Sequence, residues 1–208
     1  MNLSRLLHTI GCRTDSPEAE TCRIGSLHYD SRDVVPGGLF VAIEGFTFDG
    51  HAFIDDAVQR GAAAIVAQHP VAADVPVYAV ANTRRALASL ADAFFGHPSR
   101  ELILIGVTGT NGKTTTAYIL EGILQQAGFN VGVIGTVNYR YNQKAFDNPV
   151  TTPESLDLQR ILREMKTDGV SHVIMEVSSH AIDLDRIFGC DLDVAVFTNL
   201  SQDHLDYH

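Results

Sequence analysis

The sequence is short of cysteine and lysine and has no long apolar run. Its three cysteines, Cys12, Cys22 and Cys190, are odd in number and widely spaced, so a disulfide framework is excluded and reduced thiols are expected. No apolar run approaches the roughly 18 residues of a membrane span, and the N-terminal segment is too polar for a secretory signal. These absences predict a cytoplasmic protein without a membrane partner.

Basic residues are scarce as well. The 208 residues include 15 lysines and arginines against 25 aspartates and glutamates, which gives a formal net charge of −10. Nucleic-acid binding needs a basic surface to replace condensed counterions, so this balance argues against a nucleic-acid partner. Hydrophobic residues make up 45% and charged residues 19%, a composition that supports a sizeable core and argues against disorder.

The chain is predicted to divide near Pro98, because the residue before a proline avoids the α conformation and a helix should stop there. That helix is expected to begin after Asn82 as its N-cap, with apolar residues at helical spacing. The other elements expected before it are strands at 39–43, 63–66 and 77–80 and a helix over 52–60. Residues 1–98 are therefore predicted to form a small mixed α/β domain.

From residue 101 apolar strands alternate with helices, which is typical of a parallel sheet with helices on its faces. The expected elements are strands at 102–107, 131–134, 172–177 and 193–197 and helices over 114–127 and 155–166. Gly128 is expected to end the first of these helices as a left-handed cap. Residues 99–208 are therefore predicted to form a parallel-sheet domain of the P-loop type, so that the whole chain is α/β.

A glycine-rich segment, GVTGTNGKTT at 106–115, lies between a predicted strand and a predicted helix. Backbone amides in such a turn, with the positive end of the helix dipole, attract phosphate oxygens. Lys113, one of only three lysines, would reach the β- and γ-phosphates, and the Thr114 hydroxyl would ligate magnesium. The pattern G-x-x-x-x-G-K-[ST] fails at one position, where Val107 replaces glycine. The predicted nucleoside triphosphate site comprises Gly109, Thr110, Asn111, Gly112, Lys113, Thr114 and Thr115.

The loop GTNGKTT resembles the ATP-binding signature of the Mur ligases and of their relatives, the folylpolyglutamate and cyanophycin synthetases. Residues 30–54 resemble the uridine-nucleotide domain found in this family. The segments 151–159, 175–186 and 198–208 resemble the branch that adds the third residue of the peptidoglycan stem peptide. The resemblance spans residues 29–208 in order and implies a bacterial enzyme that uses ATP and Mg²⁺.

The implied reaction is an ATP-dependent ligation through an acyl phosphate. The substrates would be ATP, UDP-N-acetylmuramoyl-L-Ala-D-Glu and an amino acid, either meso-diaminopimelate or L-lysine. By resemblance, residues 1–98 form the domain that binds the UDP-sugar, and residues 99–208 form part of the central domain that binds ATP. The chain is expected to stop before that domain is complete and to lack a C-terminal domain, so it is predicted not to turn over alone.

The resemblance also assigns metal ligands. Glu176, at the end of an apolar strand, would hold the same magnesium ion as Thr114, and His204 would ligate a second one. His204 and His208 are four residues apart, but two histidines make a weak zinc site, so magnesium at His204 is preferred. The predicted catalytic residues are Lys113, Glu176 and His204.

Substrate contacts are implied in both halves of the chain. Those for the UDP moiety are Ser31, Phe46, Thr47 and Phe48, and those for the muramoyl-dipeptide are Thr151, Thr152, Ser178 and Arg186. The planar guanidinium of Arg186 suits the D-Glu carboxylate; the alternative is a surface ion pair with Asp183 or Asp185. Ser31 alone would more often be a turn residue. Two positions depart from the family pattern: Leu184 stands where a polar residue is common, and Gln202 stands where an arginine is common.

Four other functions are alternatives to this ligase. A UDP-sugar-binding module without catalysis, or a sister ligase such as MurF, would use the same two halves. A GTPase-like switch would need a guanine-reading N/TKxD motif, and the sequence has none. Folylpolyglutamate synthetase lacks a uridine-binding domain, and the segment 30–54 argues against it. The oligomeric state is not revealed by the sequence, and a monomer is expected.

Overall fold

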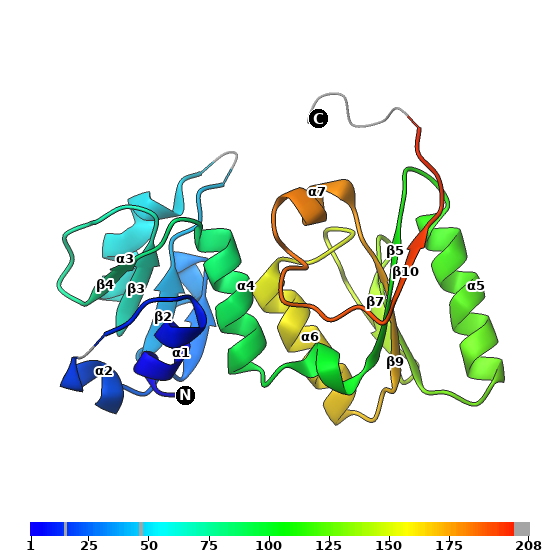
Figure 1. Ribbon diagram of the computed structural model, residues 1–208, viewed down its shortest axis with the longest axis horizontal. Helices are drawn as coiled ribbons and strands as arrows, with labels where there is room; N and C mark the ends of the chain where they lie inside the picture. The colour runs from blue at the N-terminus through cyan, green and yellow to red at the C-terminus, as the bar shows by residue number, and fades with distance from the viewer. Residues whose placement is uncertain (15, 46–47, 202–208) are drawn as a thin grey trace. The chain divides into compact units, whose positions relative to one another are not determined.

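The computed structural model describes residues 1–14, 16–45 and 48–201 of the chain, which forms two compact units, Met1–Phe94 and Phe95–His208 (Figure 1). Each unit has its own mostly parallel β-sheet with helices against it. This confirms the α/β fold class. No helix in the described ranges is long and apolar enough to cross a membrane.

The first unit is built on a four-stranded parallel sheet in the order β1-β2-β3-β4. The strands are β1 Ser26–His28, β2 Gly38–Val41, β3 Ala64–Ala67 and β4 Val77–Ala79. Every residue of β2 and β3 is buried, as is typical of central strands in a parallel sheet covered on both faces. The three strands predicted from apolar runs are therefore present, and β1 is an additional edge strand.

The helices of this unit are α1 Leu3–Thr9, α2 Pro17–Thr21, α3 Ile54–Gln59 and α4 Thr83–Phe94, with 3₁₀ turns η1 Ser31–Asp33 and η2 Gly50–Phe53. Asn82 caps α4 as predicted, since its Oδ1 accepts a hydrogen bond from Arg85 N at 3.0 Å. The sequence analysis missed α1, α2 and β1, each of which is seven residues or shorter and is held mainly by tertiary packing.

The second unit has a six-stranded sheet in the order β10-β5-β9-β6-β7-β8. The four parallel strands are β5 Ile103–Thr108, β6 Val131–Ile134, β9 His172–Glu176 and β10 Val194–Phe197. All four were predicted. No element was predicted between 135 and 154, but β7 Tyr139–Tyr141 and β8 Lys144–Phe146 extend the sheet there as an antiparallel hairpin.

The hairpin has a local physical cause. Asn142 and Gln143 both have positive φ, 49° and 61°, which suits the two-residue turns that connect antiparallel strands. The Tyr139 and Phe146 rings stack across the two strands with centroids 4.7 Å apart. Strands of three residues carry too little hydrophobic alternation to be recognised in the sequence, so these contacts appear only in the folded chain.

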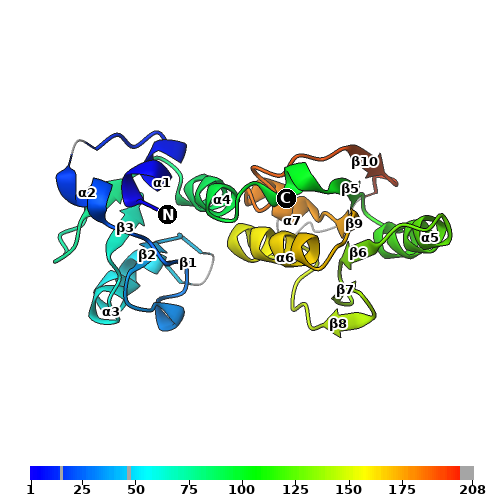
Figure 2. The same ribbon diagram turned by 90° about the horizontal axis from the view of Figure 1, so that it is seen from below.

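The helices of this unit are α5 Lys113–Gln126, α6 Ser155–Thr167 and the short α7 Ser179–Asp183, after a 3₁₀ turn η3 Pro98–Glu101. Figures 1 and 2 show α5 on one face of the sheet and α6 on the other. The strand residues that pack with α5 are Ile105, Val107, Val131, Val133 and Ile174, and those that pack with α6 are Leu104, Ile134, Val173 and Met175. This alternation is the period-two pattern of strands buried on both faces.

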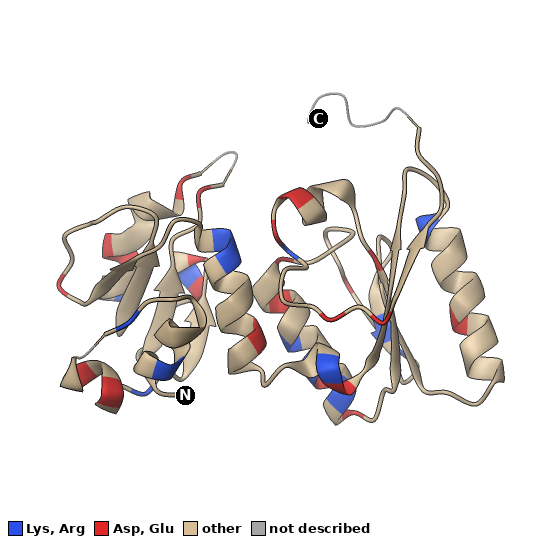
Figure 3. Cartoon of the chain, viewed as in Figure 1, with Lys and Arg blue, Asp and Glu red and all other residues tan. Residues whose placement is uncertain are grey.

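Helix α5 ends as predicted and carries little charge. Gly128 follows it with φ 88°, the left-handed conformation of a helix cap. Figure 3 shows α5 almost without charged residues. On its outer face Ile119 and Ile123 are each 57% exposed, so this side of the unit has an uncovered apolar surface.

Candidate functional site

The glycine-rich turn predicted to bind phosphate connects β5 with α5. Gly109 and Gly112 have φ of 128° and 85°, conformations that side chains other than glycine rarely adopt. The first helical hydrogen bond runs from Thr116 N to Gly112 O at 2.9 Å. The amides of the three residues before Thr116 thus lie at the positive end of a 14-residue helix, where an anion is favoured.

Lys113 is folded over this turn. Its Nζ donates to Gly109 O at 2.7 Å and to Thr110 O at 3.0 Å. These two hydrogen bonds fix the ammonium group against the carbonyls of the turn, on the amino side of α5. The turn therefore combines oriented N–H groups with a fixed positive charge, as a phosphate site requires.

The carboxylate of Glu176 lies directly beside the turn. Because β9 pairs with β5 in parallel, Glu176 stands opposite Val107 in register, just before the turn begins. The Thr114 hydroxyl donates to Glu176 Oε2 at 2.8 Å. The fold thus brings together two residues that are 62 positions apart and that the sequence analysis assigned to one metal ion.

Glu176 is only 2% exposed, and the groups that donate hydrogen bonds to its carboxylate are neutral. Besides Thr114, it accepts hydrogen bonds from the Thr136 hydroxyl at 3.1 Å and the Thr136 amide at 3.3 Å. A buried carboxylate is costly unless a positive charge or several hydrogen bonds compensate it. Mg²⁺ prefers oxygen ligands, and here two hydroxyl oxygens lie within hydrogen-bond distance of the same carboxylate oxygen. Thr114, Glu176 and Thr136 therefore fit a magnesium ion.

Thr136 was missed by the sequence analysis. It follows the strand 131–134 by two residues, and parallel sheets bind ligands at the carboxyl ends of their strands. Gly135, the residue before it, lies so close to Glu176 that an added Cβ would be 2.2 Å from Oε1. The dipeptide Gly-Thr after a buried strand is thus a usable signal: glycine makes room for the carboxylate and threonine binds it.

Two further points concern metal binding: whether metal-ligating side chains cluster, and where the predicted second magnesium ligand lies. In the described part of the chain, no three residues of the types His, Cys, Asp and Glu gather as a metal cluster. Mg²⁺ does not need one, since it commonly takes one or two protein ligands with phosphate and water oxygens. His204, the predicted second magnesium ligand, lies outside the described residues, as do His208 and Gln202.

The residues predicted to hold the muramoyl-dipeptide lie at the same edge of the sheet. Thr152 is fully buried; its hydroxyl donates to Glu176 O at 2.9 Å and accepts from Ser178 N at 3.1 Å. The hydroxyls of Thr151 and Thr136 are 3.1 Å apart. Ser178 caps α7, accepting from Ala181 N at 3.2 Å. Thr151, Thr152 and Ser178 are therefore connected to Glu176 directly or through one residue.

Arg186 joins this group from the far end of α7. Its Nη1 donates to Thr152 O at 3.1 Å, and its Nε lies 3.5 Å from Glu154 Oε2. The ion pair that the structure gives this arginine is therefore with Glu154. The Nε atom is buried and has no hydrogen-bond acceptor among the described residues. Leu184, one of the departures from the family pattern, is buried and apolar.

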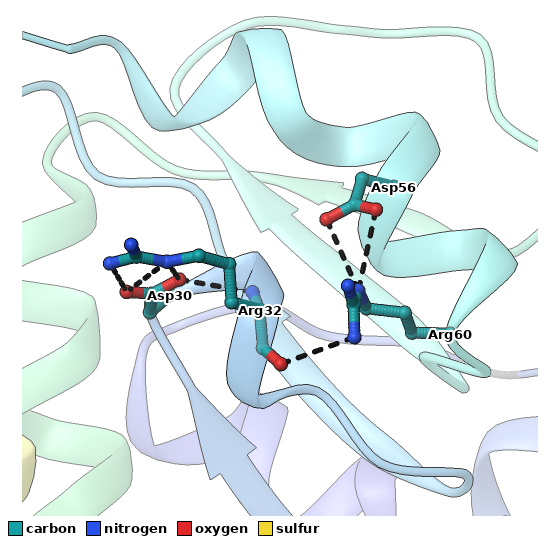
Figure 4. A network of polar contacts seen from close by, with 4 residues as sticks. All are labelled: Asp30, Arg32, Asp56 and Arg60. Carbon is teal, nitrogen blue, oxygen red and sulfur yellow. Dashed lines mark hydrogen bonds and ion pairs between the residues drawn. The ribbon is translucent and has the colours of Figure 1, made fainter.

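In the first unit, Ser31 is buried within a polar network. Its hydroxyl hydrogen-bonds the Asp56 carboxylate and, with Arg60, holds the pKa of Asp56 below its usual range. Arg60 also donates to Arg32 O at 3.3 Å (Figure 4). The guanidinium of Arg32 donates hydrogen bonds to the Asp30 carboxylate, which lowers the pKa of that carboxyl. Ser31 is thus a turn residue, in η1, that also lies between two charged pairs.

The other residues predicted for the uridine moiety are Phe46, Thr47 and Phe48. Phe48 is 71% exposed, while Phe46 and Thr47 lie outside the described residues. His51 connects Asp49 with the end of β3, because its Nε2 accepts from Gln68 N at 2.9 Å while Nδ1 contacts Asp49 Oδ1 at 2.6 Å. Since Nε2 accepts, the proton is on Nδ1. The exposed Phe48 ring is free to stack on a flat ligand.

Comparison with known proteins points to one family for both units. Residues 23–95 match the model described as Mur ligase family, catalytic domain, and residues 107–208 match the Mur ligase middle domain. The chain is 56% identical over 185 residues to a UDP-N-acetylmuramoyl-L-alanyl-D-glutamate–2,6-diaminopimelate ligase of Geobacillus thermodenitrificans, covering 89% of this chain and 38% of that protein. Against a similar ligase of Bacillus licheniformis the identity is 49% over 208 residues, and the chain spans 43% of its length.

Solved structures agree on the fold. A structure of a UDP-N-acetylmuramoyl-L-alanyl-D-glutamate–2,6-diaminopimelate ligase matches all of this chain and 42% of its own, with a TM-score of 0.83 at 24% sequence identity. MurF ligase from Thermotoga maritima, solved in complex with ADP, is 30% identical, with a TM-score of 0.62 over 89% of this chain and 39% of its own. The chain thus spans about two fifths of the length of the relatives it matches.

Proposed function

Because the chain belongs to the Mur ligase family, we propose that it forms the precursor-binding and ATP-binding parts of an enzyme that joins 2,6-diaminopimelate to UDP-N-acetylmuramoyl-L-Ala-D-Glu. The relatives named for that reaction support this choice over L-lysine. The observation that carries the proposal is the juxtaposition of Lys113, Thr114 and Glu176 at the carboxyl edge of the sheet. Residues 1–98 bind the UDP-sugar, and residues 99–208 bind ATP with Mg²⁺.

The chemistry of the ligation explains the residues. A carboxylate must attack the γ-phosphate of ATP and release ADP to form an acyl phosphate, and the amino group then displaces inorganic phosphate to form the amide. Repulsion between the carboxylate and the γ-phosphate opposes the first step. Lys113 and the amides at the start of α5 would bind the phosphates and offset part of their charge. Thr114, Glu176 and Thr136 would hold a magnesium ion, which supplies further charge neutralisation when bound.

The precursor is oriented by the residues around Thr152. Thr151, Ser178 and Arg186 surround the end of β9, next to the proposed phosphate site. Arg186 could bind an incoming carboxylate with two hydrogen bonds of its planar guanidinium, whose Nη1 donates to Thr152 O and whose Nε lies 3.5 Å from Glu154. In the first unit, Ser31 and Phe48 contact the uridine diphosphate.

The proposal is tested by calorimetric titration of the 208-residue chain with ATP·Mg, UDP and the UDP-muramoyl-dipeptide. Lys113→Ala is expected to weaken ATP binding by at least about a hundredfold, because a charged hydrogen-bond donor to the phosphates is lost. Binding of UDP should be unchanged, since the proposed uridine site lies in the other unit. If UDP binding fell with ATP binding in a folded variant, the two-site proposal would be wrong.

Arg186 offers a second prediction. Arg186→Lys keeps the positive charge but removes the bidentate geometry, so affinity for the UDP-muramoyl-dipeptide is expected to fall by about tenfold. The affinity for UDP alone should stay the same, because UDP has no D-Glu carboxylate. An equal loss for both ligands would contradict the assignment of Arg186 to the dipeptide.

A further inference from the structure

The chain that follows β10 runs alongside the phosphate turn. β10 pairs in parallel with β5, so the two strands reach the carboxyl edge of the sheet side by side (Figure 1). Thr198 N then donates to Thr108 O at 2.9 Å, which continues the pairing up to the start of the turn. Residues 198–201 thus lie against a turn that is about 90 positions earlier in the sequence.

The side-chain amide of Asn199 pairs with both the N–H and the C=O of Asn111. Its Nδ2 donates to Asn111 O at 2.9 Å, and its Oδ1 accepts from Asn111 N at 3.0 Å. The carbonyl of Asn199 also accepts from Thr110 N at 3.1 Å. A side-chain amide that pairs with both the donor and the acceptor of one residue fixes the orientation of that residue.

Two hydroxyl groups complete the contact. The Thr198 hydroxyl is a shared donor to two carbonyl oxygens, Asn111 O at 2.7 Å and Thr108 O at 3.2 Å. The Thr110 hydroxyl donates to Ser201 O at 3.1 Å and accepts from Ser201 N at 3.0 Å. We call residues 198–201 with these hydrogen bonds the loop clamp.

The loop clamp decides which amides of the turn are available to a ligand. The amides of Thr110 and Asn111 are directed to Asn199 and are already paired. The amides that precede Thr116 at the start of α5 have no such role in the clamp, and Lys113 is the first residue of that helix. Phosphate would therefore be bound by the start of α5, while the earlier part of the turn serves as its support.

We propose that Asn199 is a positioning residue for nucleotide binding: it holds Asn111 so that the start of α5 and Lys113 face the phosphates. Asn199 acts through the turn and does not bind the nucleotide. This inference rests on the proposed function, because it assigns a support to the same phosphate site. The added residue lies in the segment after β10 and not in the glycine-rich turn.

The test is titration of the 208-residue chain with ADP·Mg. Asn199→Ala and Asn199→Leu both remove the two side-chain hydrogen bonds, and the leucine keeps a similar volume. Each is expected to raise the Kd for ADP by about tenfold, because the turn loses two hydrogen bonds that order it. The matched control is Asn130→Ala, which removes one bond to Gly169 O at 3.0 Å near the amino ends of the strands and should leave the Kd unchanged.

Amide hydrogen exchange separates positioning from general stability. In the wild-type protein the Asn111 amide should exchange slowly, and in both Asn199 variants it should exchange at least about tenfold faster while the amides of β9 keep their protection. A rapidly exchanging Asn111 amide in the wild type would overturn the inference, even if the variants failed to fold. So would an unchanged Kd in either variant. Failure of the wild type to bind ADP would instead remove the proposed function itself.

Discussion

Glu176→Gln is expected to abolish most of the effect of Mg²⁺ on ATP binding. Glutamine keeps the volume and can still accept hydrogen bonds from Thr114 and Thr136, which are 2.8 and 3.1 Å from the present carboxylate. It removes the negative charge that a divalent cation needs. Altering even an outer partner of a metal ligand costs about 10–100-fold in metal affinity, so loss of the ligand's charge should cost at least about a hundredfold.

The measurement is the Kd for ATP with Mg²⁺ and with a chelator, in the wild type and the variant. The wild type should bind more tightly with Mg²⁺, and the variant should show nearly the same Kd in both conditions. The matched control is Glu164→Gln, a carboxylate on α6 that pairs with Arg160 on the surface. Retention of the full Mg²⁺ effect in Glu176→Gln would mean that the metal is held elsewhere.

The variant Gly109→Ala is expected to destabilise the second unit and its phosphate turn together. A Cβ at this position would lie 2.2 Å from the Thr198 hydroxyl and 2.8 Å from Asn199 O, and φ is 128°. Neither the backbone of Asn199 nor the strand before it can move freely, so strain and overpacking add. The free energy of unfolding is expected to fall by about 2–4 kcal/mol.

Chemical denaturation of the variant checks this value, and ADP titration should show a weaker Kd. Gly122→Ala is the matched control: it lies within α5, and an added Cβ meets nothing within 4 Å. That substitution should stabilise the unit by about 0.5–1 kcal/mol, because alanine favours the helix over glycine. Equal stability of Gly109→Ala and the wild type would show that the loop clamp is loose.

Much of the second unit could be predicted because its signals are local. The strands β5, β6, β9 and β10 are continuous apolar runs, so they were recognisable from the sequence, although β10 is an edge strand that is largely exposed. The glycines and Lys113 of the turn are contiguous in the sequence and have a known physical use. Gly128 and Asn82 marked helix ends for equally local reasons, namely a left-handed cap and a side-chain cap.

What the residues alone dictated was therefore the class of the fold, the phosphate turn and the types of group around it. Tertiary structure decided which distant groups meet. Thr136 reaches Glu176 because β6 and β9 are neighbours, and Asn199 reaches Asn111 because β10 lies next to β5. Strand order depends on how helices pack against both faces of the sheet, a long-range property that no short segment encodes.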